Sequence, residues 1–229
     1  MILAAAVALY VWAQGQDLDE IEQRTLNRDF IVTSLEQHIK LVIVATAVVA
    51  VTAIPIGTLL TRGRLRAFAP AVVAFANAGQ AVPTLGVIVL LSFWIGIGFE
   101  VAVVGLAIYA FLPALRNTIV GFSQVDPSIL EAAHGMGMSG FRTLTRVEFP
   151  LALPIIIAGL RITIVLNVAN ATIATFVNAG GMGALIVNGI QLQRTPVLIV
   201  GGVTVALLAV SFDWLAGRAE ALAAHMAWG

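Results

Sequence analysis

The chain of 229 residues contains no cysteine, and this absence excludes three kinds of function. Without thiols it forms no disulfide scaffold, no zinc-thiolate site and no cysteine nucleophile. Charge is scarce too: Asp, Glu, Lys and Arg make up 10% of the residues, and 12 basic residues cancel 12 acidic ones. A sparse and balanced charge gives no basic field of the kind that binds nucleic acid.

Apolar residues take the place of the missing charge. They make up 60% of the sequence, and the mean hydropathy is +1.00. A soluble domain has about 45–50% apolar and about 25% charged residues, so the excess here must be solvated by lipid. The same composition excludes a disordered chain. Function therefore has to be sought in where the few charged and polar residues stand.

Five uncharged runs can cross a bilayer as helices. Crossing the roughly 30 Å hydrocarbon layer takes about 20 residues, and only helices and closed barrels satisfy their own backbone there. No run alternates polar and apolar residues as a barrel strand does. The sequence therefore predicts an all-α integral membrane protein with five core spans, in the runs 41–60, 67–99, 101–115 (extended past Arg116), 162–193 and 195–212.

Residues 1–16 are uncharged as well, but their contiguous apolar part is only about 13 residues, short for a crossing. No basic residue precedes this part, so a cleaved secretory signal is the weaker interpretation. We expect a short N-terminal hydrophobic helix that crosses the membrane beside the five core spans.

The run 67–99 is too long for one straight crossing, and Pro83 lies inside it after the polar segment 77–80. Proline removes a backbone donor and kinks a helix. We therefore expect two helical pieces that meet around residues 79–83. An interrupted helix at membrane depth is tolerated where it is buried in protein or lines a cavity, and the alternative is a simple kink without a ligand role.

Arginines set the expected orientation, because Lys and Arg concentrate in short cytoplasmic loops. They cluster in segments that alternate correctly to share one side of the membrane. We expect this side, with the C-terminal tail 218–229, to be cytoplasmic, and the acidic segment 17–36 to be extracytoplasmic. The arginines are Arg62, Arg64, Arg66, Arg116, Arg142, Arg146 and Arg218.

The polar connection 116–150 predicts two short helices that meet at a glycine elbow. Asp126 can cap a first helix that begins with proline, and Gly135 and Gly137 end it. Ser139 can cap a second helix, which runs on until Pro150 interferes.

The elbow also carries an apolar patch of Met136, Met138 and Phe141. Such a patch calls for a protein partner unless the protein covers it with its own helices. Both interpretations stay open on the physics alone.

The residues of the elbow resemble a known motif. Glu131-Ala132-Ala133, then Gly137, then Val147-x-Phe149-Pro150 have the spacing of the "EAA" motif (E-A-A-x3-G-x9-I-x-L-P) of binding-protein-dependent ABC importer permeases. Valine and phenylalanine replace isoleucine and leucine conservatively. Other segments resemble the permeases for glycine betaine, choline, carnitine and proline betaine, over roughly 37–217: they are 116–118, 125–127, 131–138, 147–154, 158–161 and 178–186.

This resemblance implies a function and a set of partners. The chain would be the permease transmembrane domain, at 37–217, of an ATP-driven importer of small osmoprotectants, with a coupling region at 126–150. Two cytoplasmic ATP-binding subunits would hold ATP and magnesium, a second permease would complete the pore, and a separate extracytoplasmic protein would bind the substrate. The chain itself would be no enzyme and would hold no cofactor or metal, and it would lie in a bacterial cytoplasmic membrane.

The resemblance also implies which residues seat the elbow in the ATPase subunit. Glu131 offers a carboxylate, Ala132 and Ala133 allow close approach, and Gly137 permits the turn. The apolar patch of Met136, Met138 and Phe141 would supply the buried anchors that dominate most interfaces. The full expected set is Glu131, Ala132, Ala133, Gly135, Met136, Gly137, Met138, Phe141 and Pro150.

Polar residues inside the spans are the candidate substrate pathway. Thr163, Asn167, Asn170 and Asn178 have helical spacing, which predicts one face of the helix in the run 162–193, and Gln80 stands at the break in the run 67–99. Polar side chains avoid lipid and face protein or water. They line the pathway or hydrogen-bond one helix to another. Aromatic faces, which bind quaternary ammonium groups, are few in the spans, so we expect strong recognition in the separate binding protein.

The remaining ionisable residues have plain interpretations. Asp213 and Arg218 are expected to form an interfacial pair or cap, His38 and His134 to lie at the interfaces, and Glu100 to mark the outer mouth between two helices. The alternative function is a secondary, ion-coupled transporter. Such a protein ordinarily shows internal repeats and an acidic residue at the midplane, and neither is evident.

Overall fold

A computed structural model describes residues 2–228, with side chains described to residue 226, and folds them into helices and turns, with no strand in this part of the chain. The all-α prediction is confirmed. The elements follow in the order α1 (Ile2–Gln14), α2 (Glu20–Thr25), α3 (Arg28–Leu59), η1 (Gly63–Phe68), α4 (Ala69–Ala81), α5 (Thr84–Ile95), α6 (Phe99–Ser123), α7 (Pro127–Gly135), α8 (Gly140–Thr143), η2 (Leu144–Glu148), α9 (Phe149–Asn170), η3 (Ala171–Val177), α10 (Gly183–Gln191) and α11 (Thr195–Trp228).

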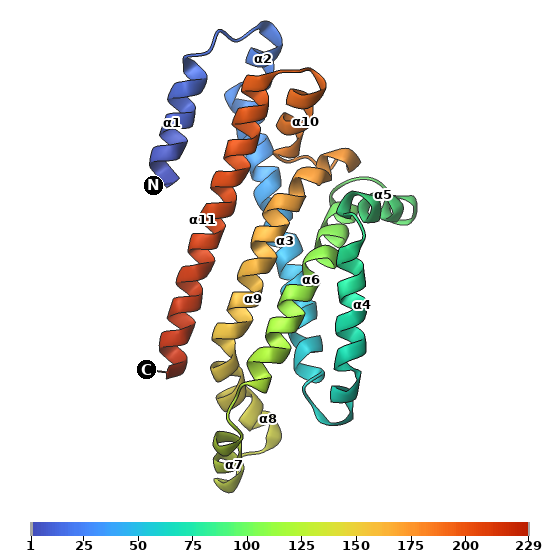
Figure 1. The fold of residues 1–229 in the computed structure, drawn as a ribbon, viewed down its shortest axis with the longest axis vertical. Coiled ribbons are helices and arrows are strands. Elements are labelled where there is room, and N and C mark those ends of the chain that lie inside the picture. The colour runs from blue at the N-terminus through green and yellow to red at the C-terminus, as the bar shows by residue number, and fades with distance from the viewer. Residues whose placement is uncertain (1, 229) are drawn as a thin grey trace.

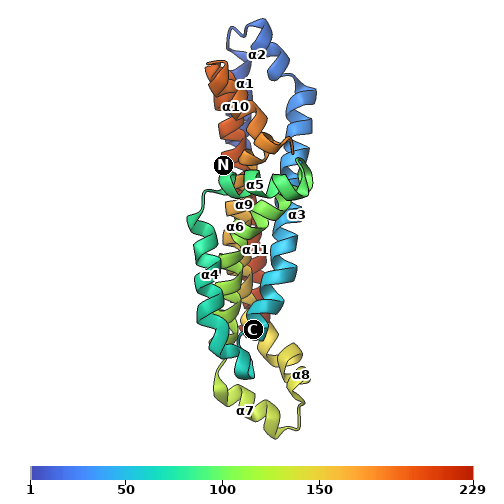
Figure 2. The ribbon, with the colours of Figure 1, turned by 90° about the vertical axis from the view of Figure 1, so that its right-hand side faces the viewer.

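The long helices run side by side along the molecule (Figures 1 and 2). Four helical runs are long and apolar enough to span a membrane: α3, α6, Gly140–Val177 and Thr195–Met226. The segment Gly63–Ala81 and α5 form a fifth span if a bent pair counts as one. Five core spans agree with the prediction, and the chain is a multi-pass membrane protein.

The predicted break in the run 67–99, the third span counted from the N-terminal helix, is confirmed. α4 ends at Ala81 and α5 begins at Thr84, and the two pieces meet at 97°. Val82 is extended, as the residue before a proline prefers to be, and Pro83 precedes the first residue of α5. The bend turns α5 across the bundle, which Figure 1 shows.

α9 lies at the centre of the bundle and packs on α3, α6 and α11. Small residues allow the close approach, as they do between membrane helices in general. A Cβ atom at Gly159 would stand 3.0 Å from the carbonyl oxygen of Pro113 on α6, and a Cβ atom at Gly105 would overlap the side chain of Ile88 on α5. These positions therefore fix how near α6 comes to its neighbours.

The span expected at 162–193 has other bounds in the structure. The uncharged run 162–193 predicts one helix, but α9 begins at Phe149, the 3-10 helix η3 continues it to Val177, and a turn then leads to the separate helix α10. The chain turns at Asn178, Gly180 and Gly181, which have positive φ angles of 57°, 77° and 93°. Absence of charge therefore marked apolar surroundings here and not the bounds of a helix.

The N-terminal helix α1 is present, but at about 1.5 Å per residue its 13 residues fall well short of the hydrocarbon thickness. It packs on α11 and lies beside the N-terminal part of that helix only (Figure 1). Residues 20–36, expected as part of an acidic outer segment, form α2 and the first turns of α3, and residues 218–228, expected as a tail, continue α11. Met1 and Gly229, at the ends of the expected segments, lie outside the described residues.

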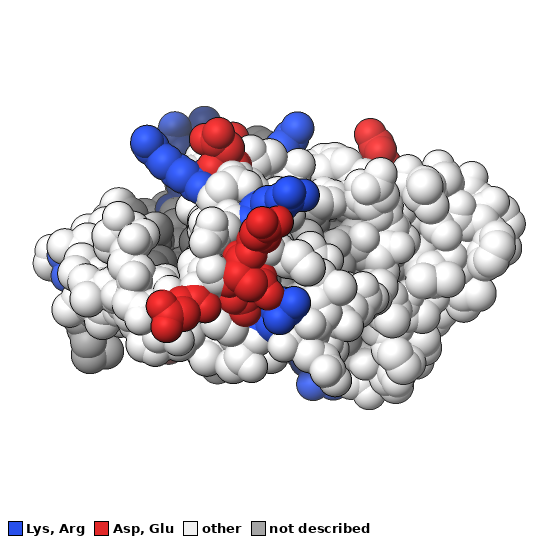
Figure 3. All heavy atoms as spheres, turned by 90° about the horizontal axis from the view of Figure 1, so that it is seen from above, with Lys and Arg blue, Asp and Glu red and all other residues white. Residues whose placement is uncertain are grey.

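Seen from the α2 end, Asp, Glu, Lys and Arg side chains gather near the middle of the molecule, and most of the rest of this face is uncharged (Figure 3). Asp19 caps α2 by accepting from the Glu22 backbone N–H at 2.8 Å, and its second carboxylate oxygen lies 2.8 Å from Arg194. This ion pair joins the α2 segment to the turn between α10 and α11.

Candidate functional site

The predicted elbow stands beyond the ends of the spanning helices, at the opposite end from α2 (Figures 1 and 2). Asp126 caps α7 by accepting from the Ser128 backbone N–H at 2.8 Å, and this hydrogen bond lowers the pKa of the Asp126 carboxyl below its usual range. Ser139 caps α8 by accepting from the Arg142 backbone N–H. Both predicted caps are therefore present.

The turn of the elbow depends on Gly137. Its φ is +80°, a conformation that strains any residue with a Cβ atom. The Gly137 N–H donates to the His134 carbonyl at 2.9 Å, and the Met138 N–H donates to the Ala133 carbonyl at 3.1 Å. This pair of bonds is the Schellman motif, which satisfies the free carbonyls at a helix end. The chain therefore reverses within three residues.

The apolar residues of the elbow differ in exposure. Met136 is 75% exposed and Phe141 is 77% exposed, while Met138 is half-buried. Ala133 is buried, whereas Ala132 and Glu131 are exposed. No residue in the described part of the chain covers the two large side chains. The elbow thus presents an apolar knob of Met136 and Phe141, with Glu131 and Ala132 beside it.

The expectation that Pro150 ends the second elbow helix is wrong. α8 passes through the π-helical turn η2 directly into α9, and Pro150 lies in the first turn of α9. The Phe149 N–H donates to the Leu144 carbonyl five residues earlier. The wider turn leaves the proline, which has no N–H, without a clash. The elbow is consequently continuous with the central membrane helix.

An ion pair that the sequence did not predict lies at the base of the elbow. Glu148 is only 5% exposed, and Arg62, in the turn after α3, holds its carboxylate with two nitrogens, at 2.9 Å and 2.7 Å. The Arg62 guanidinium also lies 5.3 Å from the centre of the Phe122 ring. The signal in the sequence was Glu148 itself, an acid directly before an apolar span.

Two of the expected pathway residues are engaged between helices. Thr163 is buried and donates to the Ala110 carbonyl of α6 at 3.1 Å. Asn167 is buried and donates to the Thr46 hydroxyl of α3 at 3.0 Å. These contacts favour the open alternative, in which the polar side chains hydrogen-bond one helix to another.

Two other candidates are bonded to helices at the broken span, each through a different partner. Asn170 is half-buried and accepts a hydrogen bond from Thr84 on α5 at 3.0 Å, and Gln80, also half-buried, donates to the Tyr109 carbonyl at 2.9 Å. They therefore tie the two pieces of the third span to α9 and α6. Asn178 does not share their face, because it is exposed in the left-handed turn after η3. The prediction of one helical face fails at this residue.

His38, expected at a membrane interface, is fully buried within the protein. Its Nδ1 accepts from the Met182 backbone N–H at 3.3 Å, and its Nε2 lies 3.0 Å from the Val168 carbonyl. An acceptor Nδ1 and a carbonyl opposite Nε2 require the neutral ring with hydrogen on Nε2. Gln37 accepts from the Gly181 N–H at 3.0 Å. The two side chains bind Gly181 and Met182 and so hold the turn 180–183, named the outer turn, against α3.

The expected pair of Asp213 with Arg218 is also corrected. Five residues apart on a helix, the two side chains point in different directions. Asp213 instead accepts two hydrogen bonds from Arg161 of α9, at 2.6 Å and 2.7 Å, and Glu220 adds a third at 3.2 Å. The Arg218 guanidinium lies 5.7 Å from the centre of the Trp214 ring. The charges therefore join α9 to α11.

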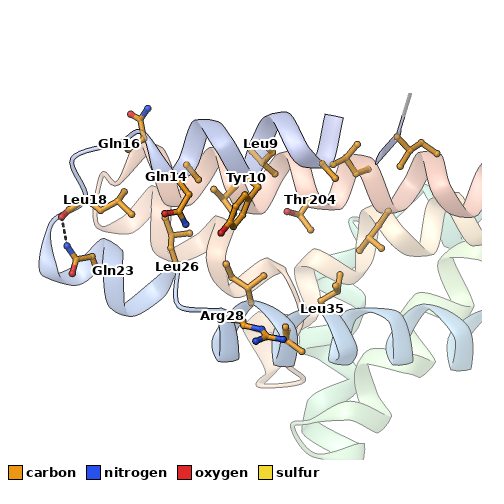
Figure 4. Close-up of a pocket in the computed structure, with 18 of the residues that line it drawn as sticks. Leu9, Tyr10, Gln14, Gln16, Leu18, Gln23, Leu26, Arg28, Leu35 and Thr204 are labelled. Carbon is orange, nitrogen blue, oxygen red and sulfur yellow. Dashed lines mark hydrogen bonds between the residues drawn. The ribbon is translucent and has the colours of Figure 1, made fainter. Parts of the chain in front are cut away.

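A cavity of about 760 Å³ lies between α1, the start of α3 and α11 (Figure 4). Leu9 and Tyr10 line it from α1, Leu35 from α3 and Thr204 from α11. It contains none of the expected pathway residues. The close pair of rings formed by Phe122 and Phe149, 6.2 Å between centres, lies at the base of the elbow. Neither feature forms an aromatic site at the broken span.

Comparison with known proteins gives a consistent result. The model of the family described as "Binding-protein-dependent transport system inner membrane component" matches residues 53–222. The osmoprotectant import permease protein OsmY of Salmonella typhimurium is 34% identical over 215 residues, which cover 94% of this chain and 89% of that protein. The glycine betaine/carnitine/choline transport system permease protein OpuCB of Bacillus subtilis is 35% identical over 184 residues, 80% of this chain and 84% of the relative.

The fold is found in a solved structure as well. A chain of the MetNI methionine ABC transporter in inward-facing conformations superposes with a TM-score of 0.74 at 22% identity. The match covers 90% of this chain and 99% of that one. At 22% identity this likeness shows a shared fold and nothing further.

Proposed function

The chain belongs to the family of binding-protein-dependent transport system inner membrane components, and on that premise we propose that it is the permease subunit of an ATP-driven importer of small osmoprotectants. Glycine betaine, choline, carnitine or similar quaternary amines are the proposed substrates. The names of the relatives OsmY and OpuCB support this class. The single observation that carries the coupling role is the exposed apolar knob at the tip of the elbow, with Met136 and Phe141 each at least three-quarters exposed.

The partners follow from the same proposal. Two cytoplasmic ATP-binding subunits seat the elbows, a second permease of the same or a similar kind completes the pathway, and an extracytoplasmic protein delivers the substrate. The orientation is the one with the elbow and the end of α11 in the cytoplasm of a bacterium. Support comes from the arginine-bearing segments η1, α8 and η2, which lie at one end of the molecule (Figure 1).

The residues of the elbow divide the work of coupling. Met136 and Phe141 insert into the cleft of the ATP-binding subunit, because a few buried apolar anchors provide most of the affinity of an interface. Ala132 allows the subunit to approach α7 closely, and Glu131 pairs with its donors. When ATP draws the two subunits together, the elbows follow and the helices rock between the inward-open and outward-open arrangements.

The expected pathway residues serve the same proposal in a modest way. Gln80 and Asn170 lie at the broken span, where backbone and side-chain polar groups stand at membrane depth. A quaternary ammonium group offers no hydrogen to these side chains. Strong recognition is therefore assigned to the separate binding protein, and the permease provides passage.

Reconstitution tests the proposal. The permease is placed in liposomes with its ATP-binding subunits and its binding protein, and uptake of labelled glycine betaine, choline and carnitine is measured with ATP and without it. We expect uptake of at least one of these solutes that stops without ATP or without the ATP-binding subunits. Concentrative uptake by the permease in the absence of a nucleotide-hydrolysing partner would contradict the proposal and indicate a secondary transporter.

A further inference from the structure

The elbow is joined to the membrane helices at two places. Its entry is the end of α6, where Phe122 lies, and its exit is the π-helical turn η2, which ends at Glu148. Arg62 comes from neither segment but from the turn after α3, 86 residues before Glu148. Three parts of the chain therefore meet around one guanidinium group.

Arg62 touches both ends of the elbow at once. Its Nη1 donates to Oε1 of Glu148 at 2.9 Å, and its Nη2 lies 2.7 Å from Oε2. The face of the same group lies 5.3 Å from the centre of the Phe122 ring. Phe122 in turn packs against Phe149, the residue after Glu148. The entry and the exit of the elbow are thus held together through one arginine and one pair of rings.

The chemistry of this contact requires arginine. A carboxylate that is 5% exposed needs a partner that satisfies its oxygens. A planar guanidinium fits both oxygens while it lies over an aromatic ring, whereas a lysine ammonium is a point charge that cannot do both. Arg64 and Arg66, in the same loop, are exposed and form no ion pair in the described part of the chain. An arginine that only added positive charge at the membrane surface would need no buried carboxylate partner such as Glu148.

We propose that Arg62 is a positioning residue that clamps the two ends of the elbow to α3, so that the elbow and the helices α3, α6 and α9 move as one body. The proposal rests on the coupling role of the elbow. Without the clamp, the elbow still binds the ATP-binding subunit. Its movement then bends the connection between η2 and α9 and does not reach the membrane helices. ATP hydrolysis then continues while solute movement falls.

The test uses the full complex in liposomes and measures three quantities: the amount of ATP-binding subunit that copurifies, ATP hydrolysis, and solute transported per ATP hydrolysed. For Arg62→Met we expect copurification and hydrolysis close to those of the unaltered protein, with transport per ATP about tenfold lower, within the range that coupling residues reach. Arg62→Lys, which keeps the charge without the fork, should lie between the two. Arg64→Met is the matched control and should leave the ratio unchanged.

A second variant separates the clamp from simple folding. Arg62→Met leaves the buried Glu148 carboxylate without a partner, so the double variant Arg62→Met with Glu148→Gln removes that burden. We expect this protein to fold and to bind its partners, with the low transport per ATP preserved. A normal ratio in the double variant would overturn the clamp.

Loss of the ATP-binding subunits from the Arg62 variants would overturn the clamp as well, because Arg62 would then be needed for docking or folding. Failure of the proposed function is recognised differently. In that case substitutions at Met136 and Phe141 would leave copurification intact, whatever the Arg62 variants do.

Discussion

Two turns of similar composition stand at opposite ends of this protein, and they differ in what covers them. The elbow contains Gly135-Met136-Gly137-Met138, and the outer turn contains Gly180-Gly181-Met182-Gly183. Met136 is 75% exposed, whereas Met182 is completely buried with Leu185 in a cluster with Val197 and Val200. Gln37 and His38 also bind the outer turn through its backbone.

This difference teaches where a partner is needed. The outer turn is completed by its own chain, so its glycines serve close packing. The elbow has equally good local geometry, with both helix caps and a Schellman turn, yet its large apolar side chains have no cover among the described residues. An ordered apolar surface that the protein does not bury is typical of an interaction site.

The largest effect is expected at the outer turn. A Cβ atom at Gly183 would overlap the backbone carbonyl of Thr172, which cannot move aside. We expect Gly183→Ala to reduce the yield of folded permease about thirtyfold or more, because overpacking against backbone destabilises by about 1–3 kcal/mol or more. Size-exclusion chromatography of detergent-extracted protein measures it.

The control for that experiment is Gly140→Ala at the other end. Nothing lies within 4 Å of a Cβ atom at Gly140, and its φ is not positive. This variant should be extracted in normal amount. Equal yields for the two variants would show that the outer turn is not closely packed.

The second largest effect is expected at the elbow. We expect Gly137→Arg to insert normally into the membrane but to reduce ATP-dependent uptake at least about tenfold, because the side chain strains a residue with φ of +80° and distorts the docking surface. Uptake and membrane content are measured in the same vesicles. Unimpaired uptake with this variant would remove the elbow from the coupling route.

A third, smaller effect separates the two bonds of His38. Asparagine places an oxygen where Nδ1 stands and can still accept from the Met182 N–H, while glutamine places an amide where Nε2 stands and reaches only the Val168 carbonyl. If the outer turn is held by the Met182 bond, His38→Asn retains more uptake than His38→Gln. The expected difference is about three- to tenfold, the range of one buried hydrogen bond. The reverse order would assign the holding role to the bond with Val168.

The smallest effect is expected inside the bundle. Asn167→Ala removes the bond to Thr46, and such interhelical bonds contribute about 0.6 kcal/mol on average. We expect uptake within about threefold of normal at all solute concentrations, because a loss of that size changes an equilibrium less than threefold. A large rise in the solute concentration needed for half-maximal uptake would instead place Asn167 on the pathway.

Features governed by local chemistry were predicted well from the sequence. The cap at Asp126, the turn at Gly137 and the break before Pro83 depend on residues within a few positions of each other. The apolar runs likewise predicted the number of spans, but not the bounds of the helix expected at 162–193. One sequence sufficed for these elements, because helix ends and proline breaks are specified by neighbours in the chain.

Contacts between distant segments were the part that could not be predicted. Arg62 and Glu148 are 86 residues apart, and Gln37 and Gly181 are 144 apart. Spacing along one helix indicates which side chains share a face, but it does not indicate which helix lies opposite. For the same reason Asp213 was paired with its neighbour Arg218 and not with Arg161 on another helix. The π-helical turn before Pro150 has no local signature either.

Cross-linking from the elbow tests the central claim most directly. The chain contains no cysteine, so one introduced thiol gives a unique attachment point. We predict that Phe141→Cys and Met136→Cys, treated with a thiol-to-amine cross-linker in intact membranes, each trap the ATP-binding subunit, while Phe93→Cys, on the equally exposed Phe93 of α5, does not. If neither elbow position ever traps that subunit in membranes that contain it and transport solute, the elbow is not the coupling site.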